Sequence, residues 1–263
     1  MNEWAAHRRL VIFLIAGAVV VAFVAIMLVA ALYRSPSCVD NKKNQDEVGV
    51  DCGGSCSYLC TSQVAAPTVL FTGLLRNATG RTDLVASIEN KNTNAAARSV
   101  LFNVKLYKGD KDQTLVREMR GTLDLPPRAT VPVFIPAVAS GGQTSLHAFL
   151  EIAPSAPRWY TMATDPRIVP VVSHTTLGGT PSAPRVEATL SNPSIATMTN
   201  VRAVILVHGT SGNVIAASET VVFSIPAQGQ ATATFTWNEA FSGMPLSIEV
   251  VPIIPLPAQA GLP

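Results

Sequence analysis

The chain has 263 residues, a formal net charge of +2 and 48% hydrophobic residues. Its 19 basic and 17 acidic residues nearly balance, which excludes the strongly basic field typical of nucleic-acid-binding proteins. The mean hydropathy of +0.32 is raised by one uncharged stretch near the N-terminus. The composition therefore indicates a globular chain with one membrane-directed segment and no nucleic-acid partner.

The uncharged stretch covers residues 10–32, whose 23 positions suffice to cross a hydrocarbon core of about 30 Å as a helix. Trp4 and Tyr33 flank it, where amphipathic rings prefer the headgroup level. Arg8 and Arg9 precede it as a basic flank of the kind usually retained in the cytoplasm. We therefore expect a single-pass transmembrane segment at residues 10–33.

A cleavable signal peptide is the alternative interpretation, because Val29 and Ala31 form a small-residue cleavage pattern. Signal peptides have apolar regions of about 7 to 15 residues, so the longer stretch favours an uncleaved signal anchor. Basic residues lie on both sides and do not orient it, but the cysteines that follow suggest an oxidising compartment. We expect a cytoplasmic N-terminus at residues 1–9 and an extracytoplasmic remainder.

Beyond residue 64, short runs of alternating apolar and polar residues are separated by Gly, Pro, Asn and Ser. This pattern predicts an all-β fold. Each half of the region carries enough strands for a core of its own, so we expect two tandem, separately folding immunoglobulin-like β-sandwiches. The predicted strands are 84–90, 100–107, 131–135 and 147–152, then 185–192, 200–207, 213–223, 231–237 and 246–251.

The two sets of strands align at an offset of about one hundred residues, close to the length of one such sandwich, which indicates an internal duplication. Asn90 aligns with Asn192 at a strand end. Asparagine closes its own turn by side-chain hydrogen bonds, so it suits a strand exit. Phe102 also aligns with Val204 and Val104 with Leu206, while the turn at Leu125–Pro127 falls near Ile225 and Pro226, and Phe134 falls near Phe235.

Six prolines between residues 154 and 184 mark the connection between the halves. Residues 168–172 can supply a first strand there if it lies at a sheet edge, since Pro170 cannot donate to a ladder. The expected domains are the cysteine-rich segment at 34–64, the first sandwich at 65–153, the connection at 154–184, the body of the second sandwich at 185–254 and a flexible tail at 255–263.

The run VLFNVKLYKGD at residues 100–110 resembles bacterial surface domains of the fibronectin-like and FxLYD type, through its strand, Leu106, Tyr107 and the following turn. Val104 stands where that pattern has Phe, and Lys108 where it has Asp. The resemblance implies an immunoglobulin-like fold, and adhesion, scaffolding or partner binding rather than catalysis.

The segment CVDNKKNQDEVGVDCGGSCSYLC, residues 38–60, contains all four cysteines. It resembles the motif C-x-D-x3-N-x2-E-x-G-x-D-C-G-G-x-C of anchored surface proteins of bacteria, including the candidate phyla radiation. Asn41 occupies a position where Gly is common. A dense cysteine cluster in an exported chain predicts two disulfides, and three pairings of Cys38, Cys52, Cys56 and Cys60 stay open.

Other chemistry for these cysteines fits less well. A zinc site would need paired C-x2-C ligands, whereas thirteen, three and three residues separate the cysteines. CGGSC resembles a cysteine-protease run, but Ser57 replaces the aromatic residue, and no His and Asn follow at the expected distance. A C-x-x-C redox pair is absent.

Calcium is the remaining candidate cofactor. Its ligands would be the oxygen-bearing side chains of Asp40, Asn44, Glu47 and Asp51. Three of them fall at positions one, five and twelve of an EF-hand-like count, but Lys42 stands at position three and Gln45 replaces the turn Gly. The alternative is a solvated acidic loop capped by its own backbone bonds.

No His in the sequence has an evident carboxylate or nucleophile partner, so we expect no enzymatic activity. An exported hydrolase would need a nucleophile, a base and an orienting group. The sequence predicts a membrane-anchored extracytoplasmic protein that binds, adheres to or scaffolds a protein or a surface polymer. The alternative is an accessory subunit of a cell-envelope machine, such as a secretion or pilus complex.

Overall fold

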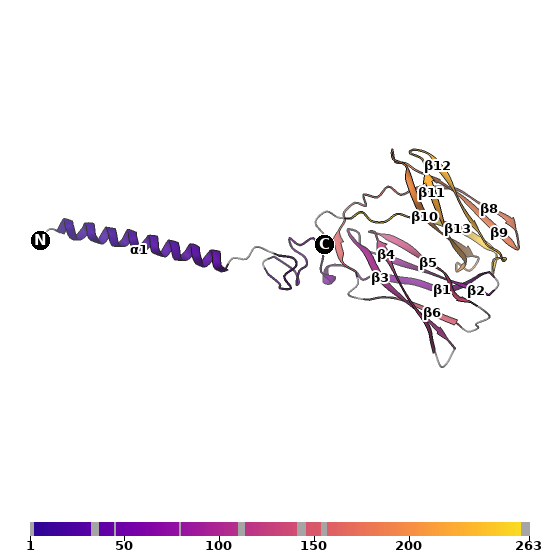
Figure 1. Cartoon of the computed structure of the whole chain (residues 1–263), viewed down its shortest axis with the longest axis horizontal. Helices are drawn as coiled ribbons and strands as arrows, with labels where there is room; N and C mark the ends of the chain where they lie inside the picture. Colours follow the sequence, from indigo (N-terminus) through magenta and orange to yellow (C-terminus); the bar gives the residue numbers. More distant parts are fainter. Residues whose placement is uncertain are drawn as a thin grey trace. The chain divides into compact units, whose positions relative to one another are not determined.

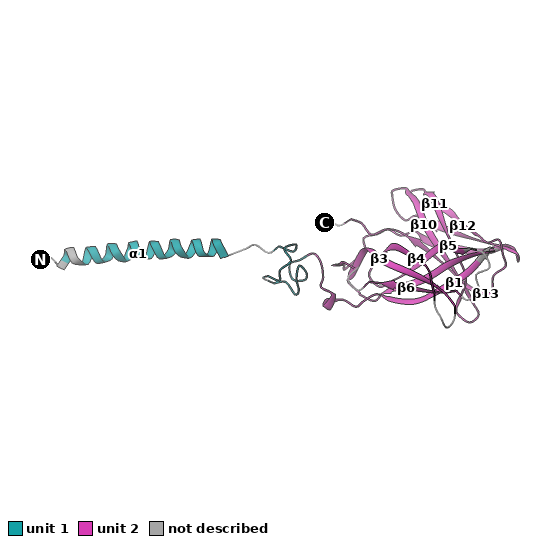
Figure 2. Cartoon of the chain, turned by 60° about the horizontal axis from the view of Figure 1, so that its bottom comes forward, with its two compact units in different colours: residues 1–56 teal, residues 57–263 magenta. Residues whose placement is uncertain are grey.

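The structure is a computed structural model that describes residues 3–32, 37–44, 46–78, 80–109, 114–140, 146–153 and 157–258. The chain divides into two compact units, residues 1–56 and residues 57–263 (Figure 2). The first unit holds a long helix and most of the cysteine-rich segment. The second holds the thirteen described strands.

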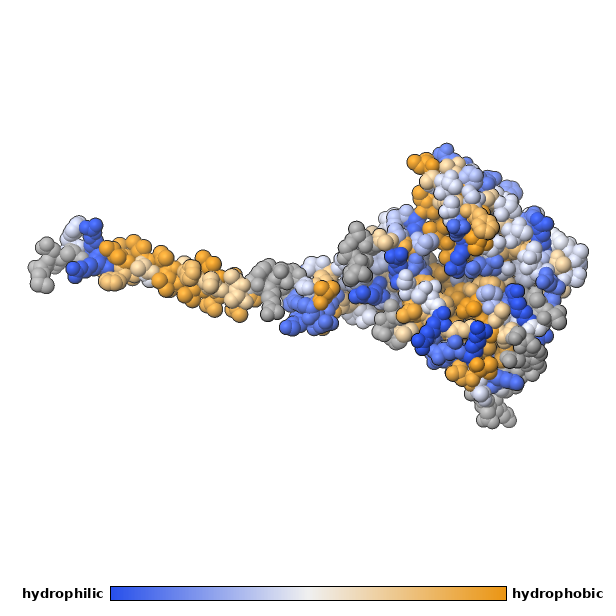
Figure 3. Space-filling model, in the orientation of Figure 1, coloured by the Kyte–Doolittle hydropathy of each residue, from blue (hydrophilic) through white to orange (hydrophobic). Residues whose placement is uncertain are grey.

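Helix α1 spans Glu3–Leu32. Within its part from His7 to Leu32, an 18-residue window has a mean hydropathy of 3.1, and none of that window is buried in the protein. Figure 3 shows apolar surface along most of its length. The Arg8 guanidinium lies 5.5 Å from the centroid of the Trp4 ring at its N-terminal end. The helix has the length and composition of a membrane anchor or a signal sequence.

The strands form two β-sandwiches of the same topology, which confirms the predicted all-β fold (Figure 1). In the first, sheet β1-β2-β5 packs on sheet β4-β3-β6, and β7 pairs with β3. In the second, sheet β8-β9-β12 packs on sheet β13-β10-β11. Each of β1 to β6 therefore has a counterpart seven strands later, as expected for a duplicated unit.

The first sandwich contains β1 (Thr68–Ala78), β2 (Arg81–Asn90), β3 (Ala95–Lys108), β4 (Thr114–Leu125), β5 (Ala129–Ser140), β6 (Leu146–Ile152) and β7 (Trp159–Thr161). The second contains β8 (Val171–Thr180), β9 (Ala183–Ser191), β10 (Met198–Gly209), β11 (Val214–Ile225), β12 (Gln230–Thr236) and β13 (Pro245–Ile253). The short 3-10 helix η1 (Thr61–Gln63) precedes β1.

Three strands, β1, β4 and β7, have no counterpart among the predicted ones, and only the first two residues of β8 fall within the edge strand expected at residues 168–172. The side chains of β4 are mostly exposed, so its sequence TLVREMRGTLDL lacks a clear apolar alternation. Strand β8 begins at Val171, directly after Pro170, and lies at the edge of its sheet. An edge position accommodates the neighbouring proline because that side of the strand needs no ladder hydrogen bonds.

Each sandwich has a hydrophobic core, and a third cluster joins the two. In that cluster Val85 of β2 packs with Val204 and Leu206 of β10 and with Ala217 of β11. Strands β2 and β10 therefore bury side chains on both faces, one toward their own core and one toward the other sandwich. Residues 57–263 form one compact unit in which the two cores are joined, and separate folding of each sandwich stays a prediction from the sequence.

The segment after β13 crosses to the first sandwich. Leu256 is 1% exposed, and its backbone N–H donates to Asp124 Oδ2 at 2.6 Å. This buried leucine corrects the expectation of a flexible tail at residue 256, and residues 259–263 lie outside the described part of the chain. Leu256 packs with Ala96, Tyr160, Met162 and Tyr58.

Candidate functional site

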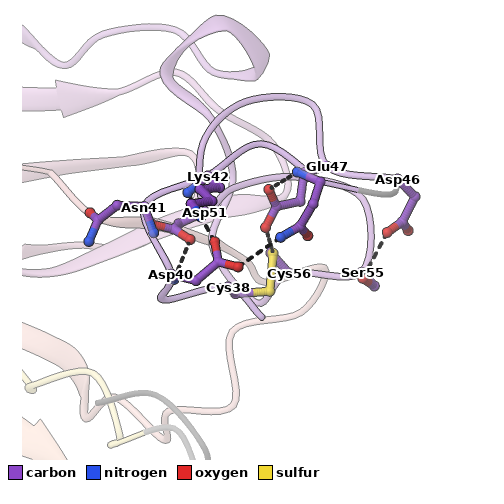
Figure 4. The surroundings of a disulfide bond; sticks show 10 residues. Cys38, Asp40, Asn41, Lys42, Asp46, Glu47, Asp51, Ser55 and Cys56 are labelled. Atoms are coloured by element: carbon purple, nitrogen blue, oxygen red, sulfur yellow. Dashed lines mark hydrogen bonds between the residues drawn. A yellow bond between two sulfur atoms is a disulfide. The ribbon is translucent and has the colours of Figure 1, made fainter. Parts of the chain in front are cut away.

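The cysteine-rich segment is closed by a disulfide between Cys38 and Cys56, whose Cα atoms are 5.6 Å apart (Figure 4). Cys52 and Cys60 are the other two disulfide-bonded cysteines, and none of the four is free. This confirms the predicted disulfides. Because every thiol is oxidised, the segment offers no thiolate to a zinc ion and no nucleophilic cysteine.

Two of the predicted calcium ligands bind the backbone of the same loop (Figure 4). Asp51 accepts hydrogen bonds from the N–H groups of Asp40 at 3.0 Å and Asn41 at 2.9 Å. Asp40 in turn accepts from the N–H of Lys42 at 2.9 Å and from Asn44 Nδ2 at 2.8 Å. These bonds hold the start of the loop against Asp51, which is the self-capped arrangement that the sequence offered as the alternative to calcium.

Glu47 is the buried carboxylate of the loop, with 4% of its surface exposed. Its Oε2 accepts a hydrogen bond from the Asn44 N–H at 3.1 Å, and its Oε1 lies 3.2 Å from Cys56 Sγ. A disulfide sulfur carries no hydrogen, so the second contact is not a hydrogen bond. Oδ1 of Asn44 is buried without a hydrogen-bond partner among the described residues.

One metal-ligand cluster occurs among the described residues, formed by Cys38, Glu47 and Cys56, with ligand atoms within 4.8 Å of one another. Two of these three atoms belong to the disulfide, which leaves one carboxylate as a ligand. Asp40 and Asp51 do not belong to this cluster. The predicted calcium ligands therefore meet around one ion only if their side chains rearrange.

A second candidate site is a groove of about 640 Å³ between the two sandwiches. We call it the inter-sandwich groove. It is lined by parts of β3, β4 and β5 from the first sandwich, by parts of β10 and β13 from the second, and by the linker before β8. Figure 3 shows apolar surface between the two sandwiches on the face drawn. Phe102, Val133 and Ile253 are among its apolar lining residues.

Four charged side chains line the inter-sandwich groove, namely Arg98, Arg167, Arg202 and Asp124. Both carboxylate oxygens of Asp124 already accept backbone hydrogen bonds. Its Oδ1 accepts from the Ser99 N–H at 2.8 Å, and its Oδ2 accepts from the Leu256 N–H at 2.6 Å. Arg202 pairs with Glu219 at 3.1 Å and keeps 54% of its side chain exposed. Arg98 has no ion pair with any residue of the described ranges.

The third arginine has a structural role. Arg167 Nη2 lies 2.6 Å from Asp165 Oδ2, and its Nη1 donates to the Ile254 carbonyl at 2.5 Å. The hydrogen bonds from Arg167 hold the pKa of Asp165 below its ordinary value. Burial raises the pKa of the neighbouring Tyr160, whose hydroxyl has no partner among the described residues. Arg167 thereby ties the linker to the segment that follows β13.

Sequence reasoning did not identify the groove, because its lining residues come from segments about one hundred residues apart and form no local motif. It also found no carboxylate partner for the histidines. In the structure, His208 Nε2 lies 3.5 Å from Glu249 Oε2 on the adjacent strand. Its Nδ1 lies 3.4 Å from the Gly212 carbonyl, so both ring nitrogens face groups that hold the ring in place.

No protein-family model and no curated protein gives a significant match to the chain. Similar solved structures include the red sea bream transglutaminase, at 11% identity and a TM-score of 0.22, over 70% of this chain and 29% of that one. A putative beta-galactosidase from Bacteroides fragilis has 9% identity and a TM-score of 0.19, over 66% and 32%. A family 2 beta-glucuronidase has 9% identity and a TM-score of 0.21, over 81% and 26%. The chain thus spans about a third or less of each of these proteins.

Proposed function

We propose that the chain is a membrane-anchored extracytoplasmic protein that binds or scaffolds a partner and has no catalytic activity. The observation that carries this proposal is the joining of two sandwiches into one unit, with a groove between them, in a chain that starts with an apolar helix. A shared cluster fixes the two walls of the groove, so the binding surface is preorganised.

The disulfides support an extracytoplasmic location for the residues that follow α1. Such bonds persist in oxidising compartments and are rare in the cytosol. The segment that contains them follows α1 directly in the sequence, so residues after α1 belong on the oxidising side. The N-terminus, with Arg8 and Arg9, then stays in the cytoplasm, and this orientation rests on the disulfides because basic residues flank both ends of α1.

Protease accessibility tests the topology. Cells that express the full chain with an N-terminal epitope tag are treated with external protease after any outer membrane has been permeabilised. We expect residues 65–263 to be degraded and the tag to be protected. Protection of the strands together with loss of the tag would reverse the orientation and overturn the proposal.

Affinity purification of the full chain after mild solubilisation tests the binding role. We expect a partner that is held through residues 57–263 and is lost when these residues are removed from the bait. A stoichiometric complex that survives on α1 alone would instead identify an accessory subunit of an envelope machine. Capture of no partner in either experiment would contradict both functions.

A further inference from the structure

The inter-sandwich groove is lined by strands that have a paired neighbour on one side only. Strands β4, β5 and β13 each line it and each lie at the edge of their sheet, with one paired neighbour. An edge strand presents a row of backbone N–H and C=O groups to which an extended peptide can add. Pro132 in β5 and Pro252 in β13 have no backbone N–H to donate. A peptide that adds to either edge can therefore pair with it only over a short stretch.

The charged side chains that line the groove are mostly basic. Arginines outnumber the single lining carboxylate by three to one, and that carboxylate, Asp124, already accepts two backbone hydrogen bonds. Arg167 is committed to Asp165 and Ile254. Arg98 therefore remains to receive a ligand, and Arg202 can join it by exchanging its exposed pair with Glu219 for a ligand carboxylate, because exposed ion pairs are weak. Guanidinium groups bind carboxylates with two parallel hydrogen bonds, which favours an acidic ligand.

Apolar side chains line the groove together with these basic groups. Val131 and Ile135 of β5 are half-buried and pack against the first core, Val133 between them is buried in it, and Ile253 and Val169 line the groove from the second sandwich and the linker. Side chains of an extended peptide alternate between two faces, so carboxylates can face the arginines while apolar neighbours contact the groove wall. An anionic polysaccharide would use the charges but neither the strand edges nor the apolar wall.

We propose that the inter-sandwich groove binds an extended acidic segment of a partner protein, with carboxylates on Arg98 and Arg202 and apolar side chains along β5. This inference rests on the proposed binding function and names the chemistry of its ligand. It makes Arg98 and Arg202 binding residues and Arg167 a positioning residue.

The test uses the full chain in lipid nanodiscs and a phage-displayed library of random linear peptides. We expect the selected peptides to combine Asp or Glu with apolar residues. Their affinity should fall at least tenfold in the double variant Arg98→Glu/Arg202→Glu and less in Arg98→Gln/Arg202→Gln, and it should weaken with added salt. Arg120→Glu is the matched control, because Arg120 is 73% exposed and does not line the groove.

Thermal melting of each variant, compared with the parent chain, shows that a loss of affinity is not a loss of fold. Selected peptides without acidic residues, or equal binding by the double Glu variant, would overturn the inference. Alginate binding that depends on both arginines, without any selected peptide, would also overturn it in favour of an anionic polysaccharide. If the native partner still co-purifies with the double Glu variant, the groove inference fails while the proposed function stands.

Discussion

Asn90 and Asn192 occupy the same place in the two sandwiches and make the same hydrogen bonds. Each is buried at or just beyond the end of a strand, and each donates from Nδ2 to carbonyls of the following turn and of the hairpin beyond it. The acceptors are the carbonyls of Ala95, Leu125 and Pro126 for Asn90, and of Ala196, Ile225 and Pro226 for Asn192, at 2.7 to 3.3 Å.

We predict that Asn90→Ala and Asn192→Ala each lower the free energy of unfolding by about 1 to 3 kcal/mol, because several buried carbonyls lose their donor. Denaturant unfolding of the full chain measures the change. Asn103→Ala is the control, since Asn103 is half-buried on β3 and makes no side-chain hydrogen bond within the described ranges. A loss no larger than that of the control would contradict a structural role for the buried pair.

The hydrophobic cluster that joins the two sandwiches leads to a second prediction. Leu206 is 3% exposed and packs at the junction of the sandwiches, whereas Leu101 is 56% exposed. Leu206→Ala should lower the free energy of unfolding by about 2 to 5 kcal/mol, and Leu101→Ala should have little effect. Calorimetry of the parent should show residues 57–263 unfolding in one transition. Two separate transitions would instead show that the sandwiches unfold independently, as expected from the sequence.

The sequence predicted the strands that bury one face in a core, such as β3 and β12, because this burial requires apolar and polar residues to alternate. It missed β4 and placed only the first two residues of β8, because most side chains of both strands are exposed and no core imposes a period on them. The unbroken apolar run from Ala203 to Val207 in β10 does indicate contact with a second sandwich, because a strand that is buried on both faces loses the alternation of apolar and polar residues. The sequence gives no local signal for the groove itself, because its edge strands and arginines come together only when the two sandwiches pack.

The ion pair that ties the linker to the C-terminal segment predicts a pH effect. Because the pKa of Asp165 is lowered in the folded chain, its contribution to stability is present above its ordinary pKa of 3.8 and is lost as pH falls through the folded value. Asp165→Asn should therefore cost about 1 kcal/mol at neutral pH, a value reduced for partial exposure, and nothing in strong acid.

Melting temperatures of the parent chain and the Asp165→Asn variant between pH 7 and pH 2 measure this difference. Glu118→Gln is the control, because Glu118 lies 3.6 Å from Arg120 in an exposed pair and should change stability little at any pH. A difference between parent and Asp165→Asn that stays constant down to pH 2 would rule out the ion pair as its source.

The oxidised state of the cysteines is measurable by mass. Cys38, Cys52, Cys56 and Cys60 should together carry four hydrogens fewer than the reduced chain, and a non-reducing digest should yield a Cys38–Cys56 linked peptide. Reduction should expose the loop at residues 37–56 to protease, because the loop has few buried apolar side chains of its own. Free thiols at all four positions in the membrane-bound protein would place the segment in a reducing compartment.

Calcium binding by the same loop stays a prediction from the sequence, and the structure sharpens its test. The carboxylates of Asp40 and Asp51 accept backbone hydrogen bonds, so calcium must share or replace these bonds, and its affinity should be weak. With a Kd of about 10⁻⁴ M, about 1 mM calcium would stabilise the loop by about 1.4 kcal/mol. Asp51→Asn should abolish most of that increment, and it should also weaken the calcium-free loop, because the amide group keeps only one acceptor oxygen for two N–H groups.

Asp46→Asn separates the two effects, because Asp46 is an exposed acid outside the predicted ligand set that accepts a hydrogen bond from Ser55. Calorimetric titration of the oxidised full chain, with protease protection measured in calcium and in chelator, should show binding in the parent and in Asp46→Asn, but little in Asp51→Asn. Absence of binding heat and of calcium-dependent protection in the parent would establish that these carboxylates serve only as caps of the loop backbone.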